Sequence, residues 1–358
     1  MAVYTTIDDP STYFATTLYT GNSTSRTITT GMQSDLIWIK QRNTVRPNVI
    51  FDTVNTISFA SGNSKYLVAN TDAAITSNNS TQLTGVTSTG FTMGADNSDQ
   101  INHTGSTTVV WTWKANGSGS ANTSGTINTT KTSANTTSGF SIIQWDGNST
   151  DAQSIGHGLG ASPELAIIKR TSGTRDWTVG SKAIGWGNKL VLNGTAASAS
   201  SDNFNSATPS STVFYLGAEG DTNSSGQTYI GYFFTPIQGF SKFGTYKGNG
   251  NADGTFIYTG FKPAFFLQKK SSASGSYWSL WDNKRSESGS NPIGRRLFPN
   301  VGAVESEQDS SPMSDFCSNG IKMRQTDADY NGSGVTYFYM AFSEAPLVNS
   351  NGVPCNAR

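Results

Sequence analysis

Apolar residues along this chain occur in short runs of four to eight, rich in Ile, Val, Phe, Tyr, Trp and Thr and bounded by Gly, Asn, Asp and Ser. Such runs are typical of β-strands. In the run from Thr336 to Phe342, apolar residues alternate between two faces that are both largely apolar, which indicates a central strand. No segment longer than about twelve residues keeps apolar positions at helical spacing. The pattern predicts an all-β fold with helices short or absent.

The same ordered set of landmarks occurs three times along the chain, which indicates a triplicated domain. An aromatic residue followed by x-Gly-Asn begins each copy, at Tyr19, Trp145 and Tyr246. A turn glycine comes next, followed by an apolar run that ends in a lysine, and an aromatic strand closes the copy. The runs are Leu36 to Lys40, Leu165 to Lys169 and Phe265 to Lys269, and the closing strands are Thr107 to Trp113, Thr228 to Phe234 and Thr336 to Phe342. Compositional bias explains repeated turn glycines, but it does not explain lysine-terminated runs in register.

The spacing of the copies predicts three tandem β-sandwich domains of a jelly-roll-like kind. Their expected bounds are residues 18–114, 139–238 and 239–346, with an arm at 1–17, a linker at 115–138 and a tail at 347–358. The linker is rich in Ser, Thr, Asn and Gly, so it is either coil or a hairpin between the segments at Asn122 and Ile127. Because chain ends fray unless they are docked, we expect neighbouring chains to hold the arm and the tail.

The lysine-terminated runs are apolar at consecutive positions. This fits strands buried on both faces. We expect Lys40, Lys169 and Lys269 to emerge into solvent at the ends of these strands, as long charged side chains commonly do.

Composition narrows the class of function. The chain has 358 residues, of which 13% are charged, with 24 Lys and Arg against 24 Asp and Glu. The zero net charge, together with 19 Phe, 13 Tyr and 8 Trp, favours a folded chain. The balance of charges also disfavours nucleic-acid binding. The chain has no stretch of 18 apolar residues, so we expect that it does not insert into a membrane. We also expect no signal peptide, and therefore assembly in the cytoplasm. Cys317 and Cys355 are expected to be reduced thiols.

Catalytic chemistry has little support in the residues. Only His103 and His157 could serve as an imidazole base, and both lie beside glycines in expected turns. The Gly-x-Gly around His157 precedes a strand, whereas a phosphate loop needs a helix. A Ser-His-Asp or Cys-His site requires a histidine oriented in a pocket, and neither histidine recurs among the copies. We therefore predict no enzyme activity, no catalytic residue and no cofactor.

Two binding features have competing interpretations. Asp327, Asp329 and Asn331 match the first half of a calcium loop, but the twelfth position, where such a loop needs Glu, is Phe338. A plain turn is the favoured alternative, and the three residues are weak metal candidates. Trp186, in Gly-Trp-Gly, is either an exposed platform for a sugar ring or a core residue.

Two segments resemble the repeat-domain proteins of tailed-phage virions, of the kind found in marine phages and their tail fibres. One runs from Asn122 through Gly139-Phe-Ser and Gly156-His-Gly-Leu-Gly-x-x-Pro163 to the Lys169 strand. The other is the ending, Ala341 to Pro346 and Gly352 to Arg358. The resemblance implies a virion structural protein, part of a tail fibre and oligomeric, with a trimer favoured and other virion proteins as partners. It supplies no catalytic residue, and the first copy lacks both the His-Gly-Leu-Gly turn and the proline.

These observations give three hypotheses in order of preference. The first is a phage tail-fibre or receptor-binding component that presents β-domains to a host-surface glycan or protein. The second is a capsid-surface or other structural protein that binds only virion neighbours, and the third is an enzyme acting on host polysaccharide. Specificity is expected in loops that differ among copies, including those with His157, Trp186 and Asp327.

Overall fold

The computed structural model describes residues 4–55, 57–58, 63–77, 81–96, 98–286, 291–307 and 311–355. Almost all regular structure in these ranges is antiparallel β-sheet, which confirms the all-β prediction. The helices described are two 3-10 turns of three residues, η1 (Pro10–Thr12) and η2 (Lys182–Ile184). Neither is long or apolar enough to cross a membrane. Cys317 and Cys355 are not joined by a disulfide.

Each copy builds a large sheet in which the closing strand is central, flanked by the first strand and by the lysine-terminated strand. The four shared strands are, in sheet order, β1 (Phe14–Thr20), β10 (Thr107–Trp113), β3 (Leu36–Gln41) and β4 (Val49–Asp52) in the first copy; β13 (Phe140–Asp146), β20 (Thr228–Phe234), β15 (Leu165–Arg170) and β16 (Thr178–Ser181) in the second; and β21 (Ser241–Lys247), β29 (Thr336–Pro346), β23 (Phe261–Lys270) and β24 (Ser279–Asp282) in the third. The identical order in three sheets supports the triplication seen in the sequence.

Further strands extend two of these large sheets. They are β5 (Ile57–Ser58), β6 (Asn63–Val68) and β7 (Thr76–Ser77) in the first copy, and β11 (Ser120–Asn122), β12 (Thr129–Asn135), β17 (Asn188–Val191) and β18 (Ala199–Ser200) in the second.

A smaller sheet faces each large one and completes a β-sandwich. The small sheets are β2 (Arg26–Thr29), β9 (Gly90–Met93) and β8 (Leu83–Thr87); β14 (Gln153–Gly156) and β19 (Val213–Leu216); and β22 (Phe256–Tyr258), β28 (Gly320–Met323) and β27 (Ser314–Cys317). A short pair, β25 (Arg295–Arg296) and β26 (Ser306–Glu307), adds to the third copy. One apolar cluster fills each sandwich.

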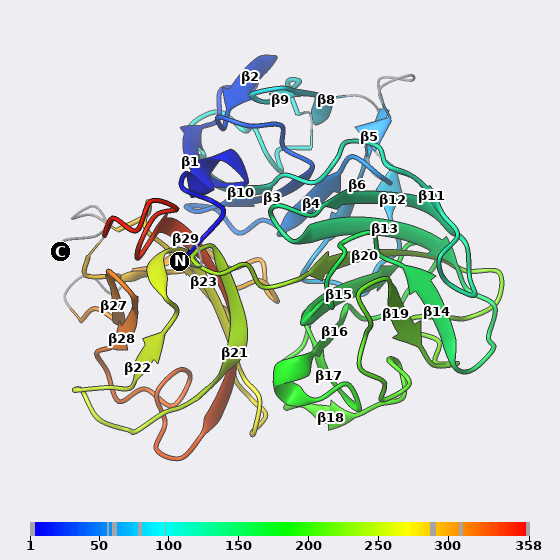
Figure 1. Cartoon of the computed structure of the whole chain (residues 1–358). Helices are drawn as coiled ribbons and strands as arrows, with labels where there is room; N and C mark the ends of the chain where they lie inside the picture. The colour runs from blue at the N-terminus through cyan, green and yellow to red at the C-terminus, as the bar shows by residue number, and fades with distance from the viewer. Residues whose placement is uncertain are drawn as a thin grey trace.

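The three sandwiches form three lobes around a shared centre (Figure 1). The second face of each large sheet contributes to one common core, which contains Trp111 from the first copy, Tyr232 from the second and Met340 from the third. These three residues hold the same register position in their central strands. The large sheets are therefore buried on both faces, as predicted for the lysine-terminated strands.

Equivalent hydrogen bonds join each copy to another and close the three copies into a ring. The backbone N–H of Arg175 donates to Asp72 in the preceding copy at 2.8 Å, and that of Gly275 donates to Thr195 at 3.0 Å. The same bond links the first copy to the third, from Arg46 to Gly302, at 3.0 Å. The tandem domains are thus not independent units, because one core and one cyclic set of hydrogen bonds unite them.

Side chains repeat this cyclic pattern at another position. Trp177 donates its indole N–H to the carbonyl of Val68, and Trp278 donates to that of Val191, both at 2.9 Å. The equivalent residue in the first copy is Asn48, whose amide donates to Phe298 at 3.0 Å. At the junction of the first and third copies, Asn48 thus stands in place of the tryptophan and still donates a hydrogen bond to a backbone carbonyl of the other copy.

The segment at 115–138 is built into the second sandwich. Of the two alternatives, coil or hairpin, the segment forms the hairpin, in which Ser120 pairs with Thr132 and Asn122 with Thr129. The second strand of this hairpin continues the large sheet by pairing with β13. In the loop of the hairpin, Ile127 forms a parallel bridge to Ile155, so the segment also covers the edge of β14.

Both ends dock on their own chain over the residues described, and the expected contact with neighbouring chains stays a prediction. The arm packs on its own chain, where Ile7 is buried in the common core. Tyr4 donates its hydroxyl to the carbonyl of Gly260 at 2.6 Å. The tail meets the arm through a hydrogen bond of 2.6 Å from the Ser350 N–H to the Asp8 carboxylate. Apolar burial and hydrogen bonds within one chain are therefore sufficient to order both segments.

The expectation that the three lysines emerge into solvent is wrong. Lys40, Lys169 and Lys269 are fully buried. Their ammonium groups donate to backbone carbonyls instead of water, and two of them reach the adjacent copy, from Lys169 to Asp72 at 3.1 Å and from Lys269 to Thr195 at 3.2 Å. A lysine at a strand end is exposed only if no neighbour covers that end, and here another copy covers it.

Burial lowers the pKa of each of these lysines to about 8. Because the unfolded pKa is near 10.5, the folded state binds fewer protons between these values, so stability should rise with pH from about 8 to 9.5. We expect a gain on the order of 1 kcal/mol per lysine. Urea unfolding of Lys169→Met across this window should show a shallower rise, whereas Lys182→Met, at an exposed site, should behave as wild type. An equal slope in both variants would contradict this.

Candidate functional site

Trp186 is a core residue, so the prediction of an exposed sugar platform is wrong and the competing one is confirmed. Its side chain is 5% exposed. The ring packs edge to face against Phe214 and Phe204, at centroid distances of 5.1 and 5.8 Å. Burying an indole between two phenyl rings contributes to stability and leaves no face for a ligand.

Asn331 is a structural residue that recurs in all three copies. Its side-chain oxygen accepts the backbone N–H of Asn249, just as Asn102 accepts that of Asn22 and Asn223 accepts that of Asn148, at 2.9 to 3.2 Å. All three acceptor asparagines are fully buried. The aromatic-x-Gly-Asn landmark therefore marks the end of the first strand of each copy, where the backbone N–H of its asparagine binds the side chain of a second, buried asparagine.

The other two calcium candidates lie in a turn. The Asp327 carboxylate accepts the backbone N–H of Asp329 at 2.7 Å, and Asp329 lies 3.6 Å from the Arg296 guanidinium. Over the described part of the chain, no three His, Cys, Asp or Glu side chains are grouped so that they could hold a metal ion. The local geometry is that of the plain turn favoured from the sequence.

Replacing Asn331 by aspartate distinguishes the structural role from the calcium role. The amide donates to the carbonyls of Asn251 and Gln325 at 2.8 and 2.7 Å, and a carboxylate would leave both without a donor. We expect Asn331→Asp to lower the free energy of unfolding by about 2 to 4 kcal/mol. Millimolar calcium should not restore it in thermal unfolding. Recovery of stability with calcium, but not with magnesium, would contradict the structural role.

The two histidines occupy different environments and assemble no nucleophilic site. His157 is buried, with Nε2 3.2 Å from the Ser210 carbonyl and Nδ1 accepting the Leu159 N–H, and burial lowers its pKa. His103 is half-exposed and lies 2.8 Å from Asp99, an orientation that the sequence did not suggest. No serine, threonine or cysteine of the described ranges hydrogen-bonds the other nitrogen of His103.

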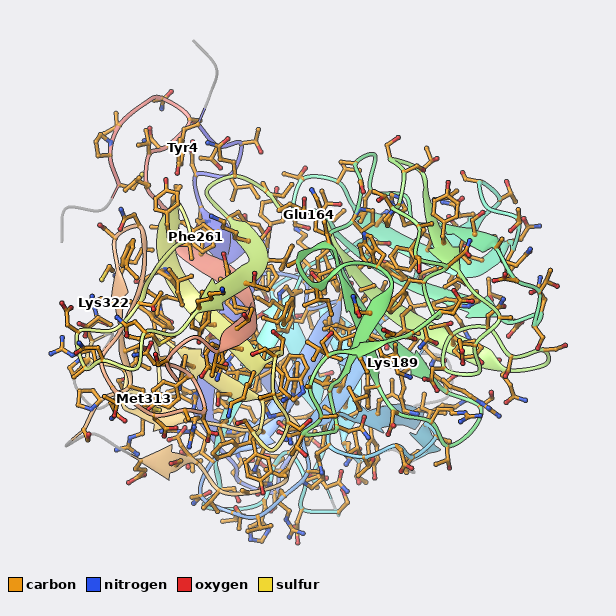
Figure 2. All side chains as sticks on the ribbon, turned by 90° about the horizontal axis from the view of Figure 1, so that it is seen from below. Tyr4, Glu164, Lys189, Phe261, Met313 and Lys322 are labelled. Carbon is orange, nitrogen blue, oxygen red and sulfur yellow. The ribbon has the colours of Figure 1, made fainter. Side chains whose placement is uncertain are left out.

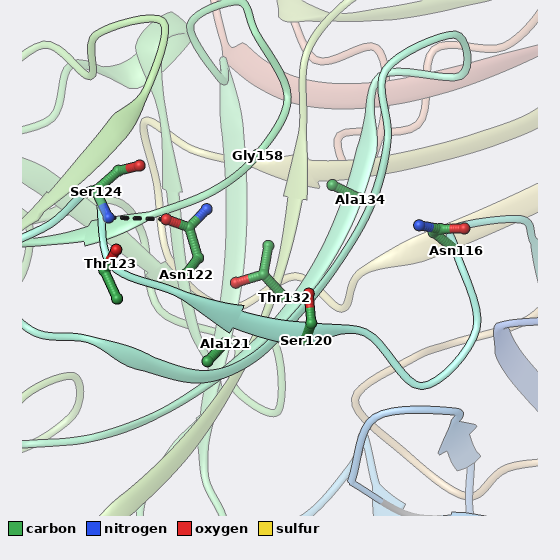
Figure 3. Close-up of a pocket in the computed structure, with 9 residues that line it drawn as sticks. All are labelled: Asn116, Ser120, Ala121, Asn122, Thr123, Ser124, Thr132, Ala134 and Gly158. Atoms are coloured by element: carbon green, nitrogen blue, oxygen red, sulfur yellow. Dashed lines mark hydrogen bonds between the residues drawn. The ribbon is translucent and has the colours of Figure 1, made fainter.

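A polar groove lies beside the hairpin of the second copy (Figure 3). Its volume is about 350 Å³, and its walls are amide, hydroxyl and small side chains, including Asn116, Ser120 and Thr132. Asn122 bends back to accept the Ser124 N–H at 2.9 Å. Gly156 gives the Asn122 side chain its space, since a Cβ would stand 2.2 Å from the Asn122 oxygen. The groove has neither a charged group nor an aromatic ring to select a ligand.

A pocket of the same volume in the third copy has different chemistry. It lies where the arm meets β21 and β22, and Figure 2 shows Tyr4 at the edge of this lobe. Tyr4, Tyr258 and Lys242 line it, together with the polar side chains of Gln238, Ser241 and Thr259. Aromatic faces combined with a few convergent polar groups are typical of ligand sites.

Strand β22 presents two aromatic side chains to solvent, and of these Tyr258 lines the pocket. Phe256 and Tyr258 point outward and are 44% and 50% exposed, whereas Ile257 between them is buried in the third sandwich. Phe256 lies over Gly320, where a Cβ would be 2.7 Å from the ring. We call Phe256, Tyr258, Tyr4 and Lys242 the aromatic site.

The aromatic site is fixed in place by short contacts. The Tyr4 and Tyr258 hydroxyls converge over Gly260, at 3.0 and 3.5 Å from the position a Cβ would take. Gly260 also has a φ of +85°, so glycine is favoured there on two grounds. Lys242 donates to the Tyr258 carbonyl at 2.8 Å, and its ammonium lies 5.0 Å from the centre of the Tyr258 ring. Burial raises the pKa of Tyr4 to about 12.

The other two copies do not have this site. In the first copy, exposed Thr27 and Thr29 occupy the positions of Phe256 and Tyr258, because Ile28 and Ile257 are equivalent in the two small sheets. In the second, the corresponding strand edge is covered, with the Ile127 N–H bonded to the Ser154 carbonyl at 2.9 Å. An alignment of the copies on these isoleucines shows threonines against aromatic residues, but it does not show that the aromatic side chains are exposed.

Comparison with known proteins identifies a family without a described function. A family model described as a domain of unknown function, DUF7483, matches residues 9–346 and so spans all three copies. No curated protein and no solved structure matches the chain.

Proposed function

The chain belongs to the DUF7483 family, and from its structure and its resemblance to tailed-phage proteins we propose that it is a virion structural protein that contacts the host surface. Its place would be a tail fibre or another receptor-binding component of the phage. The role is non-enzymatic, with assembly in the host cytoplasm and activity on the virion.

The aromatic site is the observation that carries this proposal. One copy exposes two large aromatic side chains on a strand, at 44% and 50%. Exposed aromatic residues beside convergent polar groups are enriched at recognition surfaces. The two other copies have threonines or a covered edge at these positions.

The closed ring supports a presenting role. A common core and cyclic bonds hold the three lobes together, so β22 is carried on a rigid body and not on a flexible loop. Rigid placement reduces the entropy lost on binding. The resemblance to phage proteins favoured a trimer of chains. The structure has a threefold arrangement within one chain. We also propose that whole chains associate with one another and with other virion proteins.

Immunogold labelling of intact particles of the encoding phage tests the proposal. Antibodies against the purified chain are expected to label the distal tail. Labelling spread over the head would overturn the receptor-binding role and favour a capsid-surface protein. Absence of the chain from purified particles would overturn the virion role altogether.

A further inference from the structure

We propose that the aromatic site binds an acidic saccharide, with Lys242 pairing with a sugar carboxylate and Tyr258 and Phe256 providing stacking faces. This inference rests on the proposed function and names the ligand class of that same surface. Three features of the site lead to it, namely its charge, its shape and its polar groups.

The charge of the site is positive and uncompensated. No Asp or Glu lines the pocket, and no carboxylate of the described ranges lies within 4 Å of the Lys242 ammonium. The nearby lysines differ, because Lys322 pairs with Asp253 at 2.6 Å and Lys262 pairs with Glu344 at 2.8 Å. A cation held beside two tyrosines without a counter-ion is complementary to an anionic ligand group.

The shape of the site suits sugar rings. A volume of about 350 Å³ admits one or two pyranose rings. Phe256 and Tyr258 project from the same face of β22 and form consecutive aromatic surfaces, on which the apolar C–H faces of successive sugars can pack.

The polar groups lie in the pocket beside Tyr258. The hydroxyls of Tyr4 and Tyr258 converge at one end of the pocket, and Gln238 is an exposed amide on its rim. Hydroxyl and amide groups both donate and accept, as sugar hydroxyls do. The second-copy groove has such groups without rings or charge, so it does not share this selectivity.

The test uses an array of bacterial surface polysaccharides, each printed in native and in carboxyl-reduced form. We expect the full-length protein to bind at least one acidic polysaccharide, and reduction of its carboxylates should weaken binding at least tenfold. Lys242→Met and the double variant Phe256→Thr, Tyr258→Thr should lose binding to the same extent, while Lys242→Arg should retain most of it. Binding should also weaken at high salt.

The first copy supplies the matched control. Thr27→Ala with Thr29→Ala alters the equivalent strand and should bind as wild type, and circular dichroism should show all variants folded. Binding to no polysaccharide, or binding indifferent to carboxyl reduction and to Lys242→Met, would overturn the inference. Binding to intact cells that is abolished by protease treatment would identify a protein ligand; the inference would then fail while tail labelling and the proposed function stand.

Discussion

Replacing Glu305 by glutamine is expected to lower the free energy of unfolding by about 3 to 5 kcal/mol, measured by urea denaturation at neutral pH. The Glu305 carboxylate is 3% exposed and closes the ring between the third and first copies. It accepts from Arg42 of the first copy at 2.6 Å and from Arg285 of the third at 2.5 Å. Glutamine keeps the shape but leaves two guanidinium groups without this partner in a buried setting.

The acid side of the stability profile provides a second measurement of the same ion pairs. Burial alone would raise the pKa of Glu305, but the charge of Arg285 and the bonds from Arg42 hold it below its ordinary value. The folded state therefore keeps this carboxylate ionised to lower pH than the unfolded state, and the stabilisation is lost as pH falls below the unfolded pKa of 4.5. The Glu305→Gln variant should lose less stability than wild type in this range.

Glu164 provides the control for Glu305. Its carboxylate lies 2.7 Å from Lys182, but the two side chains are 25% and 62% exposed. Solvent screens such a pair, so Glu164→Gln should change stability by less than about 1 kcal/mol. Equal effects of the two substitutions would show that the Glu305 contacts do not hold the ring closed.

Replacing Trp278 by alanine is expected to cost about 3 to 5 kcal/mol and to lower the unfolding temperature of the whole chain in one transition. The Trp278 side chain is fully buried in the common core, and its indole N–H is bonded to Val191 of the second copy. The substitution leaves a large cavity and removes one hydrogen bond at a junction between copies. Because the core is shared, the cost should be felt by all three lobes.

The neighbouring residue is the control for this substitution. Tyr277 is 45% exposed and packs against Phe298, so Tyr277→Ala should cost about 1 kcal/mol or less. Calorimetry distinguishes the shared core from independent domains. An early separate transition in Trp278→Ala, with the remaining unfolding unchanged, would indicate that the third copy folds alone and would contradict the ring.

The strand framework could be predicted because it depends on local pattern. Alternation in Thr336 to Phe342 and the consecutive apolar residues of Leu165 to Lys169 identified central strands buried on both faces, and the structure places them so. Equivalent landmarks in one order identified the three copies. These signals need only the two-residue period of a strand and the chemistry of turn residues.

Ring closure could not be predicted, because its contacts join residues far apart in the chain. The bond from Arg46 to Gly302 and the ion pair of Arg42 with Glu305 have no local signature. The burial of Lys40 was missed for the same reason, since its exposure depends on whether another copy covers the strand end. A similar limit applies to Trp186, whose flanking glycines suggested exposure although Phe204 and Phe214 enclose it.

The aromatic site lies between these cases. Phe256-Ile257-Tyr258 has the alternation of a half-buried strand, and comparison with Thr27-Ile28-Thr29 shows that the two copies differ at the exposed positions. The pocket itself also needs Tyr4, which is more than two hundred residues away in the chain and is brought to Gly260 by the docked arm. Sequence comparison among the copies could therefore locate the divergent strand, but not the ligand-sized space beside it.

Competition for phage adsorption tests most directly whether the third copy is the host-contacting surface. Purified wild-type chain, added to host cells before the encoding phage, is expected to reduce adsorption in proportion to its concentration. The folded variant with Phe256→Thr and Tyr258→Thr should compete at least tenfold less well, and the variant with Thr27→Ala and Thr29→Ala should compete as wild type. Equal competition by all three proteins, or none by wild type, would contradict a host-binding role for the aromatic site.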